Sequence, residues 1–292
     1  MLHRWTHAES EWTNKNTETI TDTVREARVE DGHGAREVSG TMDGDGLTDA
    51  ARPRTPTTDL SHMPPLGELV DGGLRGDLDD YDLTVAFRGL EHQYGPYHLE
   101  DVAAWHEESW IYDDGRIKPA EVSFTGQLRD ADGADAGSVL YSFYRDDRGR
   151  LVVKNNLTEL NDGFRGKGFS TAFSGSTEEY FRRSGADRIL VTAALADGGA
   201  AWAKAGYDWD DDPHNLATSI GNMKARIGEF LDELDAPISD RDAALLRDMR
   251  TRFDGPSTGF PSPQELVMLA GDNPKLGDDL MRGSTWHGMK TL

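Results

Sequence analysis

The chain has 292 residues and a formal net charge of −22, because 53 Asp and Glu outnumber 31 Lys and Arg. This charge argues against general binding to nucleic acids or anionic membranes, and it suits a cationic substrate such as an amine, a polyamine or a basic peptide. An acidic surface that only keeps the protein soluble is the alternative. The chain has no cysteine, which excludes disulfides, thiol nucleophiles and cysteine-based metal sites.

The start of the chain, MLHRWTHAES, is too polar for a secretory signal, and no apolar run approaches the roughly 18 residues that a membrane span needs. We therefore expect a cytoplasmic protein. Residues 1–80 are rich in Thr, Asp, Gly, Arg and Pro, and no aromatic residue occurs between Trp12 and Tyr81. Such a segment buries too little apolar surface to offset its ordering entropy, so we expect a disordered or weakly structured arm and linker.

The pattern becomes more regular after the arm. LTVAF (83–87) predicts a short strand, and HLEDVAAWHEESW (98–110) predicts a helix, because apolar residues recur at helical intervals from Leu99 to Trp110. EVSFTGQLRD, GSVLYSFYRD and LVVKNNLTEL are then separated by tight turns. These three segments predict an antiparallel meander that ends at Leu160.

A glycine-rich loop, a helix and an apolar strand follow the meander. The loop NDGFRGKGFS (161–170) leads into a helix closed by Gly185, and RILVTAA reads as a strand covered on both faces. GGAAWAKAG then predicts a helix and YDWD a short strand. The last strand of the meander, the loop, the helix that follows it and the RILVTAA strand together form one βαβ crossover. We therefore expect an α/β fold with a mixed sheet.

The loop has the composition of an anion site. Glycines at a junction of strand and helix let a ligand approach the backbone, and anions are the commonest ligands there. Gly168 follows Gly166 and Lys167 where a P-loop needs Ser or Thr, and the last glycine of a dinucleotide fingerprint is missing. The two commonest phosphate loops are therefore excluded.

The stretch RGKGFS (165–170) resembles the [QR]-x-x-G-x-[GA] motif of the GNAT superfamily, the acyl-CoA-dependent N-acyltransferases. AAWAKAGYDW is similar to the family's fourth helix, which ends in a Gly-aromatic pair, and the resemblance covers about residues 83–210 plus the C-terminal strand. It implies a GNAT-like sheet, acetyl-CoA or another acyl-CoA as co-substrate, and an amine acceptor. In that family the loop amides wrap the pyrophosphate, and the preceding strand offers main-chain groups to pantetheine and the thioester.

The resemblance also implies which residues bind coenzyme A. They are Leu160, Arg165, Gly166, Lys167, Gly168, Phe169, Ser170 and Trp202. Ser170 stands where the family has Gly or Ala, and its hydroxyl would cap the helix or contact a phosphate. Trp202 stands where many members have a tyrosine that protonates the leaving thiolate, and an indole supplies no proton. This departure fits either a transferase that works without that acid or a fold that has lost turnover.

Acylation of an amine needs a neutral amine, a polarised carbonyl and an acceptor for a proton. Glu159 is the carboxylate nearest in sequence to the implied thioester site, and it is the candidate base unless it is an outward-facing charge on a strand edge. Tyr141 and Tyr144 lie on opposite faces of the neighbouring strand, so only one lines the cleft, and Tyr141 is the candidate catalytic residue. The polar run 154–156 inside the last strand of the meander either lines a polar cleft or faces solvent. HEES lacks the second histidine of a zinc pair, so no metal is expected.

The C-terminal part reads as an insertion followed by a closing strand. Residues 213–282 predict helices with N-caps at Ser239 and Ser262, and 283–292 predicts a strand that pairs with YDWD. We thus expect a GNAT-like core over 81–212, completed by the closing strand. A lid over the acceptor site and a scaffold or oligomer contact are the alternatives for the helices.

These observations predict an acyl-CoA-dependent N-acyltransferase that moves an acetyl or longer acyl group to an amine of a small molecule, peptide or protein. No nucleic acid and no membrane is expected as a partner, and the sequence leaves the oligomeric state open. The alternative is a catalytically inactive GNAT-fold binding module in a toxin–immunity or phage-type system. Trp202 and the acidic surface favour that alternative.

Overall fold

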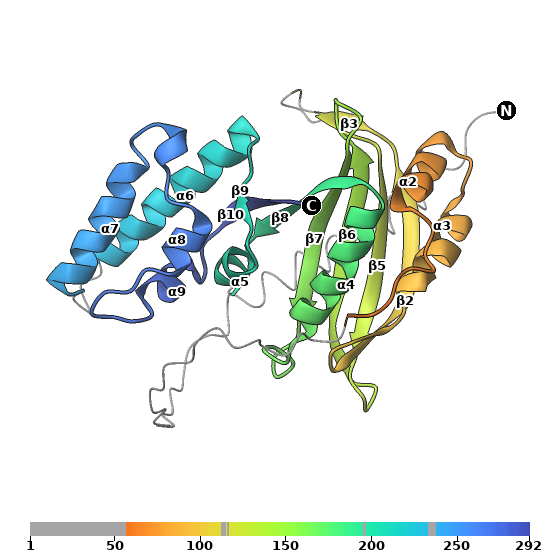
Figure 1. The fold of residues 1–292 in the computed structure, drawn as a ribbon, viewed down its shortest axis with the longest axis horizontal. Helices are drawn as coiled ribbons and strands as arrows, with labels where there is room; N and C mark the ends of the chain where they lie inside the picture. The colour runs from red at the N-terminus through yellow and green to blue at the C-terminus, as the bar shows by residue number, and fades with distance from the viewer. Residues whose placement is uncertain (1–56, 112–114, 116, 195–196, 233–237) are drawn as a thin grey trace, which may run out of the picture. The chain divides into compact units, whose positions relative to one another are not determined.

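The fold is built around a mixed sheet (Figure 1). The structure, a computed structural model, describes residues 57–111, 115, 117–194, 197–232 and 238–292. Within these residues the sheet strands are, in spatial order, β1 (Gln93–Tyr94), β2 (Tyr97–Glu107), β5 (Glu121–Arg129), β6 (Asp135–Arg145), β7 (Leu151–Leu160), β8 (Ala186–Ala193), β10 (Trp286–Thr291) and β9 (Asp208–Trp209). A separate hairpin consists of β3 (Trp110–Ile111) and β4 (Ile117–Lys118).

The expected meander and crossover are confirmed. β5, β6 and β7 pair antiparallel in chain order. Helix α4 (Phe169–Arg183) then carries the chain from β7 to β8, and these two strands pair in parallel. The class is therefore α/β, with a mixed sheet, an antiparallel meander and one βαβ crossover.

Three helices cover one face of the sheet, which we call the first face. They are α2 (Leu66–Arg75), α3 (Asp80–Phe87, followed by the short η1, Arg88–Leu90) and α4. Phe87 of α3 stacks on Phe124 and Phe143 with ring centroids 5.3 and 5.5 Å apart, and Phe173 of α4 meets the Tyr141 ring at 5.9 Å. An aromatic core thus fills the space under the helices. The opposite, second face bears Ser142, Lys154, Leu190 and Thr192, which share it by strand register.

The segment 83–87 lies in α3, so the strand predicted there is wrong. Asp79 begins this helix, because its side chain accepts from Asp82 N while Asp82 reaches back to Asp79 N, a reciprocal cap. Leu83 and Phe87 are buried four residues apart, whereas Val85 is 52 % exposed. The alternation of apolar residues in this segment was therefore coincidental. The aspartates that cap the helix were the better indication of its structure.

The segment 98–110 is mainly strand β2, so the helix predicted there is also wrong. A bulge occurs near Asp101, whose φ is 54°, and the pairing with β5 shifts at that point. Leu99 faces inward before the bulge, and Val102 and Ala104 face inward after it. Because the bulge inserts one residue, the inward-facing Leu99 and Val102 are three positions apart instead of two. A three-residue spacing of apolar residues is also typical of one face of a helix.

Side chains close the outer edge of β2. Thr84 Oγ1 donates to Ala104 O at 3.1 Å and accepts from Ala104 N at 2.9 Å. His106 N donates to Asp80 Oδ1 at 3.1 Å. An open strand edge can pair with another chain, so these contacts from α3 protect the sheet.

The helical insertion between β9 and β10 is present as predicted. It consists of α6 (Pro213–Asp232), α7 (Asp240–Arg252), η2 (Ser257–Gly259), α8 (Pro263–Val267) and α9 (Leu276–Met281), and α5 (Gly198–Lys204) precedes it. Ser239 and Ser262 cap α7 and α8, as predicted. β10 pairs with β9, as predicted, and also with β8, so the closing strand lies between them.

Most of the predicted N-terminal arm, residues 1–56, lies outside the described residues. Its last part packs on the core, because Leu66 and Val70 of α2 are fully buried. Arg183 of α4 also donates to Leu60 O at 2.6 Å. The core therefore begins before residue 81. The lack of aromatic residues had hidden an amphipathic helix whose apolar stripe is made of Leu and Val.

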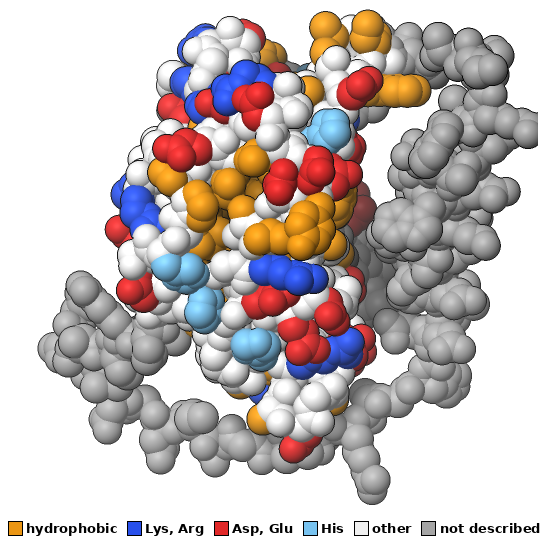
Figure 2. Space-filling model, turned by 90° about the vertical axis from the view of Figure 1, so that its right-hand side faces the viewer, with side chains coloured by type: hydrophobic (Ala, Val, Ile, Leu, Met, Phe, Trp, Pro, Cys, Tyr) orange, Lys and Arg blue, Asp and Glu red, His pale blue; other side chains and the backbone are white. Residues whose placement is uncertain are grey.

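Figure 2 shows the side of the molecule that carries α2 and α3, with apolar side chains among acidic ones. The exposed large apolar side chains of α3 and of the β3–β4 hairpin are Tyr81, Val85, Trp110, Ile111 and Ile117. Across the described ranges, none of the helices combines the length and the apolar character that crossing a membrane requires.

Candidate functional site

The glycine-rich loop between β7 and α4 presents a row of unpaired backbone N–H groups. In the described part of the chain, the amides from Arg165 to Thr171 have no hydrogen-bond partner. Gly163, Gly166 and Gly168 adopt left-handed φ values of 83°, 73° and 91°, and a side chain added at any of them would meet open space. Unpaired backbone amides and the positive end of a helix together favour the binding of an anion.

Two side chains hold this loop in shape. Tyr97 Oη donates to Phe164 O at 2.5 Å, and Arg165 Nε donates to Leu160 O at 2.9 Å. The loop is therefore fixed at its centre and at its start. A site that is shaped before its ligand arrives loses less entropy on binding.

The two cations of the loop differ in their availability. The Arg165 guanidinium lies 3.5 Å from Asp162 and 3.7 Å from Asp197, so it is occupied by carboxylates of the chain itself. Lys167 Nζ lies 5.3 Å from the centre of the Phe164 ring, and among the described residues it has no ion-pair partner. Lys167 is thus the cation that is available to a phosphate group.

Three further residues of the predicted coenzyme A site have separate places. Ser170 is exposed on the first turn of α4 and makes no cap bond. The Phe169 ring is buried and stacks on Phe173 at 5.2 Å, so it belongs to the core. Leu160 ends β7, and Arg165 occupies its carbonyl group. The loop brings the backbones of these residues together but directs their side chains differently.

Strands β7 and β8 separate halfway along β7. In the described chain their parallel pairing ends at Asn155 and Val191. β7 bulges at Asn156, where its register with β6 shifts by one residue, and residues 157–160 then stay paired with β6 alone. The space between β7 residues 156–160 and β8 residues 192–193 is called the β7–β8 gap below. One edge of β7 is free there for main-chain pairing, except at Leu160 O, which accepts from Arg165.

Glu159 and Tyr141, the predicted catalytic residues, lie on opposite faces of the sheet. Glu159 is half-buried on the second face, opposite Ser138 of β6 and beside the β7–β8 gap. Tyr141 is 4 % exposed on the first face, where it stacks on Phe124 at 5.5 Å and its hydroxyl accepts from Asn155 Nδ2 at 2.8 Å. Burial raises the pKa of Tyr141. The structure therefore places only Glu159 beside the gap, and both catalytic roles stay predictions.

Trp202 lies on α5 and is half-buried. Its ring meets Tyr207 edge-on with centroids 5.1 Å apart, and Tyr207 N donates to Trp202 O at 3.2 Å. These contacts give Trp202 a packing role at the end of α5. Its role toward coenzyme A stays a prediction.

Sequence reasoning missed a polar network that crosses the second face. Asn156 Nδ2 donates to Ser142 Oγ at 2.6 Å, and Ser142 Oγ in turn lies 2.9 Å from Ser123 Oγ and 3.2 Å from Glu121 Oε1. Lys118 Nζ neutralises Glu121 at 2.8 Å. The network ties the bulge of β7 to two neighbouring strands. Its only sequence signal was the polar run inside the last strand of the meander.

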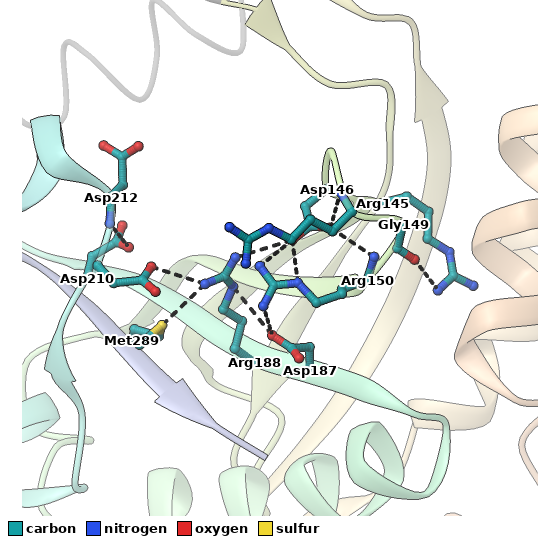
Figure 3. Close-up of polar contacts among 11 residues, drawn as sticks. Arg145, Asp146, Gly149, Arg150, Asp187, Arg188, Asp210, Asp212 and Met289 are labelled. Carbon is teal, nitrogen blue, oxygen red and sulfur yellow. Dashed lines mark hydrogen bonds and ion pairs between the residues drawn. The ribbon is translucent and has the colours of Figure 1, made fainter.

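A pocket of about 430 Å³ opens on the second face and was also missed. Beside Tyr144 and Leu190, its lining holds three guanidinium groups and four carboxylates, those of Arg148, Arg150, Arg188, Asp147, Asp210, Asp211 and Asp212. Figure 3 shows Arg150 and Arg188 among carboxylates; Arg188 lies 3.3 Å from Asp146 and 3.1 Å from Asp211. Because carboxylates outnumber guanidinium groups around it, the pocket suits a cationic guest better than an anionic one. No local pattern reveals it, since its walls come from three separate segments, 144–150, 188–190 and 210–215.

Comparisons with known proteins identify no family for this chain. No protein-family model matches the chain, and no curated protein matches it. The solved structure of a nourseothricin acetyltransferase is similar at 20 % sequence identity and a TM-score of 0.26, covering 40 % of this chain and 75 % of that one.

Proposed function

We propose that the protein is an acyl-CoA-dependent N-acyltransferase that moves an acetyl or longer acyl group to an amine. One observation carries the proposal: the unpaired amides from Arg165 to Thr171 adjoin the free edge of β7 at residues 157–160. Coenzyme A joins a pyrophosphate to an extended arm that contains two amides. An anion site followed by an open strand edge matches both parts.

Each part of the co-substrate has a partner in this arrangement. The loop amides hold the pyrophosphate, and Lys167 adds a charge to a phosphate group. The pantetheine arm pairs with the free edge of β7 as an added strand would. The thioester then lies in the β7–β8 gap, where a main-chain N–H polarises its carbonyl, and Glu159 on the same strand is one candidate base.

Calorimetric titration with acetyl-CoA tests the proposal, and Gly166→Ala is the most useful variant. Gly166 and Gly149 have φ values of 73° and 74°, and an added Cβ at either meets open space. A Cβ at left-handed φ costs about 1–2 kcal/mol, so Gly149→Ala, in the β6–β7 turn, is a control for backbone strain. We expect Gly166→Ala to weaken acetyl-CoA binding about tenfold or more and Gly149→Ala to leave it unchanged. Equal affinity in both variants would contradict the loop assignment.

A binding module without turnover is the second candidate function, and the indole at Trp202 favours it. The same titration separates the two when it is followed by a free-thiol assay in the presence of amines. Binding of acetyl-CoA with thiol release supports the transferase. No binding of any acyl-CoA favours the module.

A further inference from the structure

His287 lies beside the β7–β8 gap on the second face. It pairs across β10 and β8 with Thr192, the first β8 residue beyond the last pair with β7, which joins Asn155 and Val191. Neighbouring strands are about 4.8 Å apart, so His287 stands one strand spacing from the edge of the gap. β7 and β8 are parallel, and the glycine-rich loop leaves β7 at this same end of the sheet.

The backbone of His287 is held by the helical insertion. His287 N donates to Ser219 Oγ of α6 at 2.9 Å, and Ser219 Oγ donates to Asn215 O at 2.7 Å. Asp210 N donates to His287 O at 3.0 Å, and Asn215 Nδ2 donates to Asp210 Oδ2 at 2.7 Å. Four residues thus close a ring of hydrogen bonds. This ring fixes the point from which the imidazole projects.

The imidazole itself has one nitrogen engaged. His287 Nδ1 lies 3.3 Å from Thr192 Oγ1, and in the described chain no hydrogen bond is made by Nε2. In the tautomer whose Nδ1–H donates to Thr192, Nε2 keeps its lone pair. The side chain is half-buried, so it is reachable from solvent.

The surroundings keep this imidazole uncharged. Burial lowers the pKa of His287 below 6.5, and the charges of His214 on α6 and Lys154 on β7 lower it further. Asp210 and Asp212, between β9 and α6, act in the opposite direction without cancelling the shift. At neutral pH the ring is therefore ready to accept a proton.

The pocket on the second face lies next to His287. Leu190 lines the pocket and stands two residues before Thr192 on the same strand face, which is about 7 Å along the strand. Asp210 borders both places, since it lines the pocket and bonds to the backbone of His287. Arg150 and Arg188 of the pocket are paired with Asp146, Asp187 and Asp211. A guest with ammonium groups along an aliphatic chain would therefore meet the remaining carboxylates there, and one end would reach the imidazole.

We propose that His287 is the general base of the transfer, and that the acceptor is an aliphatic polyamine whose cationic chain lies in this pocket. The assignment rests on the proposed function. His287 Nε2 takes one proton from the ammonium group of the bound polyamine, which frees the lone pair of that nitrogen. The freed amine nitrogen attacks the thioester carbonyl carbon, a C–N bond forms and the C–S bond breaks. The second proton that the nitrogen loses passes to the departing thiolate, so amide and free thiol leave with all atoms accounted for.

NMR of the histidine Cε1–H signals tests where His287 lies relative to the thioester. The full chain is titrated with acetyl-CoA, His287→Gln identifies the signal, and His98, exposed on β2, is the internal control. We expect the His287 signal to titrate below pH 6.5 and to shift on acetyl-CoA binding, while the His98 signal stays in place. Binding detected by calorimetry without a shift at His287 overturns the assignment and leaves the proposed function standing. No binding at all overturns both.

Acyl transfer to two amines tests the chemical role. Spermidine is largely protonated at neutral pH, whereas the nitrogen of hydroxylamine is already free, so only spermidine needs a base. We expect His287→Gln to lower kcat/KM for spermidine by about 10²-fold or more and to remove the acid limb of its pH profile. Transfer to hydroxylamine should fall by less than about fivefold, and His98→Gln should change neither rate.

Three results would overturn the proposal. An equal loss for both amines indicates a structural role for His287, and no loss for either indicates no role. A wild type that binds acetyl-CoA and acylates hydroxylamine but not spermidine refutes the polyamine pocket. The melting temperature of His287→Gln is measured alongside, so that unfolding is not mistaken for lost chemistry.

Discussion

Replacing Tyr97 with Phe tests whether the shape of the glycine-rich loop sets its affinity for coenzyme A. The hydroxyl donates to Phe164 O in the loop at 2.5 Å, and Tyr97 is 1 % exposed. Burial raises the pKa of Tyr97, and the charge of Asp130 adds to the shift, so the hydroxyl stays a donor at neutral pH. Tyr97→Phe keeps the ring and removes this single bond.

The size of the effect follows from that bond. One neutral hydrogen bond contributes about 0.5–1.5 kcal/mol to stability, and in a chain of this length each kcal/mol lowers the melting temperature by roughly 2–4 °C. The freed loop must be reordered when acetyl-CoA binds. A loss of about 1 kcal/mol from the binding free energy raises Kd about fivefold.

Tyr94→Phe is the matched control for this experiment. Tyr94 lies in the same hairpin, is fully buried and donates to Leu90 O at 3.0 Å, which is also a backbone carbonyl but lies outside the loop. We expect both variants to lose similar stability by thermal denaturation, and only Tyr97→Phe to lose affinity by calorimetry. The reasoning is refuted if both bind acetyl-CoA like the wild type, or if Tyr94→Phe weakens binding as much as Tyr97→Phe does.

Two further predictions concern stability. Thr84→Val removes the hydroxyl that satisfies both backbone groups of the buried Ala104, so we expect a loss of about 2–4 kcal/mol in urea denaturation; a loss no larger than that of the exposed Thr251→Val would contradict the edge argument. Burial opposes ionisation of Glu107, but hydrogen bonds from Lys118 and Trp105 outweigh it and lower its pKa below 4.5. Its contribution to stability is therefore present above that pH and lost as the pH falls through the lowered pKa, so Glu107→Gln should lose less melting temperature than the wild type between about pH 7 and about pH 4. An identical loss in both proteins would remove Glu107 as the cause.

The parts of the fold that could be predicted are those specified by neighbouring residues. The meander follows from tight turns between three apolar segments, and the caps at Ser239 and Ser262 follow from local chemistry. The loop could be placed at the start of α4 because glycine and cations were concentrated there. β2 could not be predicted, because the bulge near Asp101 broke its period, and one inserted residue leaves no mark in composition.

The candidate site divides in the same way. Its anion-binding half is the glycine-rich loop, which is one continuous stretch of the chain. The residues of the sequence motif are therefore the same residues that present the unpaired amides. The other half consists of residues far apart in sequence, such as Ser142, Asn156 and Thr192. They meet because β7 bulges and separates from β8, and strand separation depends on tertiary pairing that no local pattern records.

The helical insertion gives this division a physical cause. β10 follows α6 to α9 in the chain, so His287 contacts Thr192 although the two residues are 95 positions apart in sequence. The same helices supply Asn215 and Ser219, which fix the His287 backbone, and the segment that joins β9 to α6 supplies three of the four carboxylates that line the pocket. An insertion that served only as an outer scaffold would need no bond to β10 at this position. Ser219→Ala removes the acceptor of His287 N and nothing that touches the proposed substrate, so it tests whether the insertion positions the second half of the candidate site.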